Sequence, residues 1–193
     1  MIKHNLITLL LLGVIPLASL CQEDIKYEKE IPIDSHLVPL NARTYVSSLN
    51  VEIVSWVKEI NFNSRSYEAK ALWNKLPTSI EFDSTGVLED IEVTIDEKRV
   101  PSSILKNIRQ VLKQHFSKFK FAKIQLQFTG ADSSLIKRMA QNDEQASITL
   151  KYEIELYGKI KTAWRMYEYL FDRDGLLEQK REISGIIFKY ENF

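Results

Sequence analysis

Residues 169–178 read Tyr-Leu-Phe-Asp-Arg-Asp-Gly-Leu-Leu-Glu, and residues 80–89 read Ile-Glu-Phe-Asp-Ser-Thr-Gly-Val-Leu-Glu. Each stretch places apolar residues on both sides of an Asp-x-x-Gly sequence. A strand, a tight turn and a returning strand are the usual meaning of this pattern. We therefore predict two β-hairpins of the same kind, one in each half of the chain.

The turn residues of the two hairpins are Asp83 with Gly86, and Asp172 with Gly175. Aspartate at the first turn position can accept a hydrogen bond from the backbone two residues further on. Glycine at the last position can take a positive φ because it has no Cβ. These four residues are predicted to have a structural role.

Composition limits the classes of function. The chain has 193 residues, 26 acidic and 26 basic side chains, and a single cysteine. A neutral balance gives no general attraction to nucleic acid or to an anionic membrane. One cysteine excludes a disulfide framework within the chain and a cysteine-based metal site. The length fits one domain, or two small modules that share one core.

The first residues have the pattern of a secretory signal peptide. A basic start at Lys3 precedes an apolar run over residues 6–15, and small residues follow up to Cys21. The run is shorter than the roughly 20 residues that span a bilayer. We predict a signal peptide over residues 1–21, cleavage between Cys21 and Gln22, and a periplasmic or secreted mature chain without a transmembrane segment.

Lipidation of Cys21 is the alternative to simple cleavage. A lipobox has a small residue directly before its cysteine, whereas this chain has Leu20 there. Cleavage is therefore favoured, and a lipid anchor is the minor interpretation.

The mature chain divides into a charged leader and two similar halves. The leader, 22–35, includes a short edge strand at Ile31-Pro32-Ile33, since proline cannot donate to a strand ladder. Val38-Pro39 opens a helix in the first half, 36–98, and Val100-Pro101 opens a helix in the second half, 99–193.

Alternating and helical patterns fill the rest of each half. The first helix is expected to end at about Leu49, and the second to carry its apolar residues up to Phe116. A polar stretch over 129–147 is predicted to be an inserted loop. The predicted fold is α+β, with an antiparallel sheet, helices packed on one face, and two tandem α-β-β-β-β repeats. Strands are expected over residues 51–62, 67–73, 79–82, 88–95, 121–128, 148–157, 163–172 and 176–183.

Three motifs carry a resemblance to a known family: Lys123-Ile124-Gln125, Tyr152-Glu153-Ile154-Glu155 and the stretch from Tyr169 to Gly175. With the Val-Pro helix starts, they resemble the PepSY-like secreted proteins of Bacteroidetes-type bacteria, a group also described as similar to β-lactamase-inhibitor proteins. The resemblance covers roughly residues 36–183. It implies helices packed on an antiparallel sheet, a periplasmic binding or inhibitory role, and no catalytic residues. Leu76-Pro77-Thr78 departs from the usual hairpin turn.

Residues suited to catalysis or metal binding are few. His36 and His115 are the histidines of the mature chain, and no nucleophile or orienting partner accompanies either. Asp172, Asp174 and Glu178 faintly resemble a calcium loop, but the spacing lacks most ligands of an EF-hand. Turn residues are the favoured interpretation. We predict no catalytic residue, no metal and no cofactor.

Aromatic residues supply the candidate binding site. Trp73, Trp164 and Tyr167 are predicted to form an exposed strip on the free face of the sheet, with Arg165 and Lys161 beside it. Core packing is the alternative for each aromatic residue.

The sequence as a whole favours a non-catalytic envelope protein that binds another protein or a peptide through its sheet face. The alternative is a small-ligand carrier with a cleft between helices and sheet. An enzyme is the third and weakest hypothesis. The partner itself, an envelope protein or peptide, is not identified by the sequence.

Overall fold

The computed structural model describes residues 24–27, 29–61, 64–130 and 149–183. The predicted signal peptide with Cys21, and nearly all of the predicted loop over 129–147, lie outside the described residues. The elements in chain order are β1 (Asp24–Lys26), β2 (Lys29–Ile33), the 3-10 turn η1 (Ser35–Leu37), α1 (Leu40–Ser47), β3 (Glu52–Ile60), β4 (Arg65–Trp73), β5 (Leu76–Phe82), β6 (Leu88–Thr94), the 3-10 turn η2 (Glu97–Arg99), α2 (Ser102–His115), β7 (Lys118–Thr129), β8 (Thr149–Ile160), β9 (Ala163–Asp172) and β10 (Leu177–Ile183).

The strands form one sheet in the order β1-β10-β9-β8-β7-β6-β5-β4-β3-β2. Neighbouring strands are antiparallel except β1 and β10, which are parallel. The predicted α+β class is therefore wrong: this is a mostly-β fold, a ten-stranded mixed sheet with two helices in the described residues. The reason is physical. The helices are short, at 8 and 14 residues, while a chain segment before the first half adds a parallel strand to the last one.

The same order of elements occurs twice after β2: a 3-10 turn, a helix and four strands. Pro39 and Pro101 stand directly before α1 and α2, where a missing N–H is not needed. Val38 and Val100, one residue earlier, are buried. Each Val-Pro pair thus anchors the start of a helix to the sheet.

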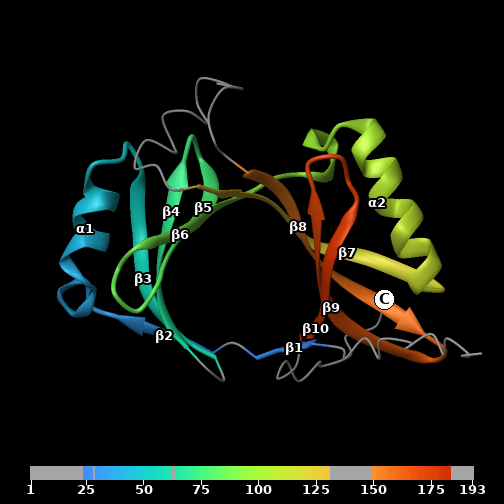
Figure 1. Cartoon of the computed structure of the whole chain (residues 1–193), viewed down its shortest axis with the longest axis horizontal. Coiled ribbons are helices and arrows are strands. Elements are labelled where there is room, and N and C mark those ends of the chain that lie inside the picture. Colours follow the sequence, from blue (N-terminus) through green and yellow to red (C-terminus); the bar gives the residue numbers. More distant parts are fainter. Residues whose placement is uncertain (1–23, 28, 62–63, 131–148, 184–193) are drawn as a thin grey trace, which may run out of the picture.

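The two edges of the sheet are consecutive in the chain. β1 and β2 stand at opposite ends of the strand order, yet only residues 27 and 28 separate them. Three Cα–Cα steps of about 3.8 Å bring Lys26 and Lys29 within about 11 Å of each other. The sheet must therefore curl until its edges meet, and Figure 1 shows it as a ring with α1 and α2 on the outside.

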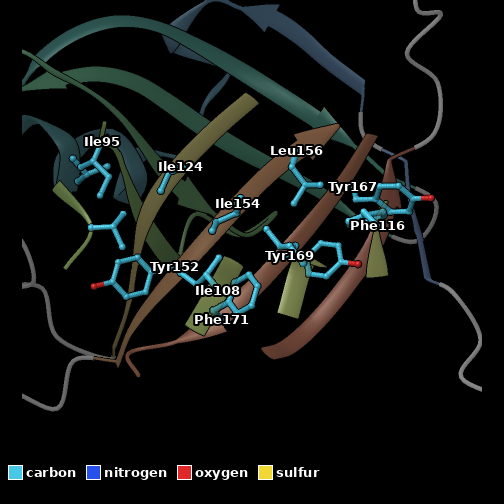
Figure 2. Packing of buried hydrophobic residues seen from close by; sticks show 13 residues of the cluster. Ile95, Ile108, Phe116, Ile124, Tyr152, Ile154, Leu156, Tyr167, Tyr169 and Phe171 are labelled. Atoms are coloured by element: carbon cyan, nitrogen blue, oxygen red, sulfur yellow. The ribbon is translucent and has the colours of Figure 1, made fainter. Parts of the chain in front are cut away.

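Both helices cover the outer face of the sheet. Ile91 packs in the cluster under α1 and Val93 in the cluster under α2, and alternation puts both on one face of β6. Trp73 and Phe128 touch both clusters and so connect them. Figure 2 shows the larger cluster, in which α2 residues lie against β8 and β9.

The two predicted hairpin turns are built alike. The Asp83 Oδ1 atom accepts from the Thr85 and Val87 amides at 2.8 and 2.9 Å. The Asp172 Oδ1 atom accepts from the Asp174 and Leu176 amides at 2.9 and 2.8 Å. A helix asparagine holds each turn from outside, Asn41 through the Gly86 carbonyl at 2.8 Å and Asn107 through the Asp174 carbonyl at 2.9 Å.

Replacement of Gly86 by alanine is expected to destabilise the protein by about 1–3 kcal/mol. Gly86 has a φ of +83°, and a Cβ there would lie 2.3 Å from the Asn41 Oδ1 atom. Gly175, with a φ of +77°, has the Ile104 carbonyl oxygen at 3.0 Å from its added Cβ, so Gly175→Ala is expected to act in the same direction. Urea unfolding measures the effect. Ser84→Ala, at an exposed position of the same turn, is the control and should change little.

Candidate functional site

The inner face of the ring is polar and encloses a cavity of about 580 Å³. Strand alternation produces this face: Tyr152 points to the buried cluster under α2, and Glu153 lines the cavity. Asp90 and Glu92 line it from β6, next to the outward Ile91. The residues around the cavity are Ile25, Lys26, Tyr27, Asn61, Glu81, Glu89, Asp90, Glu92, Gln127, Glu153, Glu168, Leu170, Gln179 and Arg181.

Acidic groups outnumber basic groups around this cavity. The basic residues of the lining are Lys26 and Arg181, and both contact Glu168, at 2.6 and 3.4 Å. The other acidic residues of the lining are Glu81, Glu89, Asp90, Glu92 and Glu153. Among the described residues, none of these five forms an ion pair. A cation that enters the cavity can therefore pair with these carboxyl groups without displacing a basic side chain of the described residues.

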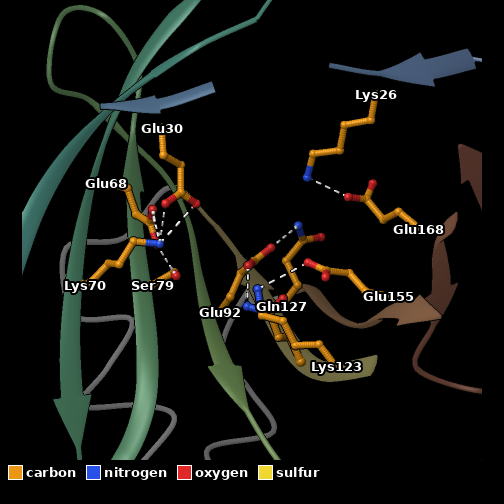
Figure 3. A network of polar contacts seen from close by, with 11 residues as sticks. Lys26, Glu30, Glu68, Lys70, Ser79, Glu92, Lys123, Gln127, Glu155 and Glu168 are labelled. Atoms are coloured by element: carbon orange, nitrogen blue, oxygen red, sulfur yellow. Dashed lines mark hydrogen bonds and ion pairs between the residues drawn. The ribbon is translucent and has the colours of Figure 1, made fainter. Parts of the chain in front are cut away.

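A second group of charges lies on the same face towards β2 and β4. The Lys70 Nζ atom contacts Glu30 and Glu68, each at 3.1 Å, and the Ser79 hydroxyl donates to Glu68 (Figure 3). On β7, Lys123 contacts Glu155 at 3.4 Å. Lysine ammonium groups therefore compensate these carboxylates.

Glu81, Asp90 and Glu92 form the tightest uncompensated cluster, which we call the β5–β6 triad. One carboxylate oxygen from each lies within 4.8 Å of the other two. The Gln127 amide donates to Asp90 at 3.1 Å and to Glu92 at 3.3 Å, and the Gln125 amide donates to Glu92 at 2.6 Å. Amide groups thus orient the carboxylates without neutralising them.

Burial raises the pKa of each carboxyl group in the β5–β6 triad. The pKa of Asp90 rises to about 8, first through burial and then through repulsion from Glu92. The pKa of Glu81 lies well above its usual range through burial and the charge of Asp90, its partner across the strands. Burial also raises the pKa of Glu92, although Lys123 opposes this shift. Asp90 therefore holds its proton near neutral pH unless a cation replaces it, and the pKa values of Glu81 and Glu92 are shifted in the same direction.

Glu153 belongs to the same electrostatic environment. Its pKa lies well above the usual range, mainly through burial and then through repulsion from Glu92 and Glu168. Two acceptor atoms on this face, Asp90 Oδ1 and Gln125 Oε1, are buried without a hydrogen-bond donor among the described residues. The inner face therefore has more buried hydrogen-bond acceptors than donors to pair with them.

The predicted aromatic residues are not gathered into one exposed strip. Tyr167 is buried and packs against Phe116 at 4.8 Å between ring centroids. Trp73 is half-buried between the two core clusters. Trp164 is half-buried on β9, and alternation places it on the opposite face from Tyr167. Because Tyr167 is part of the core, it does not belong to an exposed surface.

The two basic residues predicted beside these aromatics are exposed. Arg165 forms an ion pair with Glu182 at 2.9 Å, and Lys161 occupies the β8–β9 turn with a φ of +54°. A binding role for Trp73, Trp164, Arg165 and Lys161 stays a prediction.

The predicted alternative, a cleft between helices and sheet, corresponds to a small pocket of about 120 Å³ where α2 ends on β9 and β10. His115 lines it, and its Nδ1 atom lies 2.9 Å from the Tyr169 hydroxyl. Burial, followed by the charge of Lys180, lowers the pKa of His115. The volume of this pocket is far below that of the inner cavity, and aromatic rings line it.

Sequence reasoning missed the acidic inner face. Its glutamates occupy the polar positions of alternating strands, as in Tyr67-Glu68 and Tyr152-Glu153, and such positions ordinarily face water. The signal was the repetition of carboxylates at those positions on neighbouring strands. These carboxylates face a shared cavity only because the sheet curls into a ring.

Within the described residues, no helix is both long and apolar enough to cross a membrane. The sequence matches no protein-family model, and comparison with curated proteins finds no relative.

Comparison with solved structures finds three Bacteroides proteins at a TM-score of 0.49. A protein described as periplasmic from Bacteroides eggerthii is 11% identical, with 75% of this chain and 88% of that chain covered. A DUF2874 family protein from Bacteroides uniformis is 14% identical, with 75% and 89% covered. A BLIP-like protein from Bacteroides fragilis is 10% identical, with 81% and 94% covered. Likenesses this distant assign neither a family nor a function to this chain.

Proposed function

We propose that this chain is a non-catalytic binding protein of the cell envelope, and that its inner face takes up a positively charged segment of a protein or peptide. The observation that carries the proposal is the cavity of about 580 Å³ with five carboxyl residues that have no ion pair among the described residues. The envelope location rests on the predicted signal peptide at residues 1–21.

Electrostatics favours a cationic partner. Carboxylates gathered within low-dielectric walls focus their field on the cavity and raise the local concentration of cations. Complementary charge also speeds association and selects against acidic partners. The cavity volume is large enough for several side chains, and Ile25, Tyr27 and Leu170 offer apolar surface to their aliphatic parts.

A binding role is favoured over catalysis by the chemistry of the lining. The described residues around the cavity include no histidine, cysteine, serine or threonine, the side chains that most often act as nucleophile or proton shuttle beside carboxylates. What the lining offers is charge and hydrogen-bond acceptors, which are the means of recognition.

A lysine pentapeptide is expected to bind the mature protein, whereas a glutamate pentapeptide is expected not to bind. Isothermal titration at pH 8 and low salt measures both affinities. Because exposed charges are screened within about 10 Å at 0.1 M salt, binding should weaken as salt is added. The double variant Glu81→Gln with Glu153→Gln should bind at least about tenfold more weakly.

Asp174→Asn is the matched control, because it removes one carboxylate from an exposed turn residue that does not line the cavity. It should bind the lysine peptide as the unchanged protein does. Equal affinity for the two peptides, or no binding of either, would contradict the proposal.

A further inference from the structure

We propose that the β5–β6 triad of Glu81, Asp90 and Glu92 is a subsite for a primary ammonium group, supplied by a lysine side chain of the bound partner. This inference rests on the proposed function and names the chemistry that the inner face recognises.

The chain contains a second triad that shows what such a cluster holds. Glu30, Glu59 and Glu68 also place one oxygen each within 4.8 Å of the other two. There the Lys70 Nζ atom lies 3.1 Å from oxygens of Glu30 and Glu68 (Figure 3). A triad with the same spacing, on the same inner face, is thus occupied by an ammonium group of the protein itself.

The β5–β6 triad differs from this filled triad in two respects. No lysine or arginine of the described residues forms an ion pair with Glu81, Asp90 or Glu92. All three also line the cavity, whereas Glu30, Glu59 and Glu68 do not. Lys70 of the chain itself completes the triad of Glu30, Glu59 and Glu68, whereas the β5–β6 triad is open to an ammonium group of a ligand. Elsewhere on the cavity lining, the Lys26 Nζ atom lies 2.6 Å from a Glu168 oxygen, so an alkyl ammonium is already the partner of a carboxylate on this face.

An independent observation points to a missing donor at the same place. Gln125 is 1% exposed, and its amide nitrogen donates to the Glu92 Oε2 atom at 2.6 Å. Its Oε1 atom accepts no hydrogen bond from the described residues, and neither does the buried Asp90 Oδ1 atom. Both orphaned atoms are acceptors. An ammonium group brings three donors and no acceptor, so it supplies the donor that Asp90 Oδ1, an atom of a cavity-lining residue, lacks.

Charge favours the same occupant. An ammonium group stabilises the ionised carboxylates, so its binding must release the protons that the raised pKa values retain. Affinity should therefore increase as the pH rises from 6 to 9, below the ordinary pKa of lysine near 10.4. The titratable and charged groups that face the triad are Lys26 on β1, Glu59 on β3, Glu68 on β4, Glu89 on β6, Lys123 on β7 and Glu153 on β8.

The test compares three probes by isothermal titration of the mature protein at pH 6, 7.5 and 9: a lysine pentapeptide, an arginine pentapeptide and calcium chloride. We expect the lysine peptide to bind most tightly and to release protons on binding. Asp90→Asn keeps the shape of the side chain and removes its charge, and should weaken lysine binding about tenfold or more and flatten its pH dependence.

Glu30→Gln is the control, because it lies in the triad that Lys70 fills, and it should leave the affinity unchanged. Lysine binding that Asp90→Asn does not alter would overturn the ammonium subsite and leave the proposed function standing. Tighter binding of calcium or of the arginine peptide would likewise overturn it. Failure of every probe would overturn the proposed function as well. Thermal melting of each variant at pH 6 shows that it is folded.

Discussion

The free energy of unfolding is expected to fall by several kcal/mol as the pH rises from 5 to 9. Asp90, with a pKa of about 8 in the folded protein, titrates near 3.9 when unfolded. Between these values the folded state holds the proton that the unfolded state has released, so stability decreases with rising pH. Glu81 and Glu153, whose pKa values are also raised by burial, act in the same direction. Each unit of pKa difference corresponds to about 1.4 kcal/mol.

Asp90→Asn and Glu81→Gln resemble the protonated carboxyl groups and should stabilise the protein at pH 8 to 9 while reducing the slope. Urea unfolding at several pH values measures both effects. Asp83→Asn is the comparison: hydrogen bonds, first from Thr85, lower the pKa of Asp83, so its titration falls below this window and the slope should not change. A stability that is constant or rises between pH 5 and 9 would contradict burial of these carboxyl groups.

Phe82→Ala and Phe171→Ala are each expected to destabilise the protein by about 3–5 kcal/mol. Both rings are fully buried, and each is the last residue before the aspartate of its hairpin turn. Phe82 lies 5.8 Å from Tyr45 and 6.1 Å from Trp56 between ring centroids, and Phe171 stacks on Tyr169 at 6.0 Å. Removing either ring leaves a cavity that the surrounding strands cannot close.

Leu176→Ala is the matched control, because this large apolar side chain near Phe171 is 61% exposed. It should change the free energy of unfolding by less than about 0.5 kcal/mol. Unfolding should remain a single transition in both phenylalanine variants, since Trp73 and Phe128 connect the two core clusters. A loss below about 1 kcal/mol at one of the two positions would mean that the two hairpins do not have equivalent places in the core.

Local features were predictable from the sequence because their causes are local. The turns at Gly86 and Gly175 follow from glycine and aspartate chemistry, and α2 follows from its apolar periodicity and Val100-Pro101. Pro32 lies in β2, at one edge of the sheet, as a proline requires. The first helix ends at Ser47, two residues before the predicted end, which is the usual uncertainty of a helix terminus.

Features that depend on distant partners were not predictable. β1 has three residues and no apolar alternation, so nothing in it indicates a pairing with β10. This pairing makes the sheet mixed and curls it, and the fold class was wrong for that reason together with the shortness of the helices. The cavity could not be predicted either, because it exists only when the sheet curls. In the sequence, Glu81, Asp90 and Glu153 occupy strand positions that ordinarily face solvent. In the ring-shaped sheet, all three line the same cavity.

The strand order also has a consequence for how the protein reaches its native state. Asp24 pairs with Arg181 across almost the whole described chain, so β1 is synthesised first and finds its partner last. Joining segments so far apart along the chain carries a large loop-closure entropy, and such contacts slow folding. We therefore expect the two helix-and-strand halves to assemble early, with the attachment of β1 as a late kinetic step. The acidic inner face stays open to solvent until that step is complete.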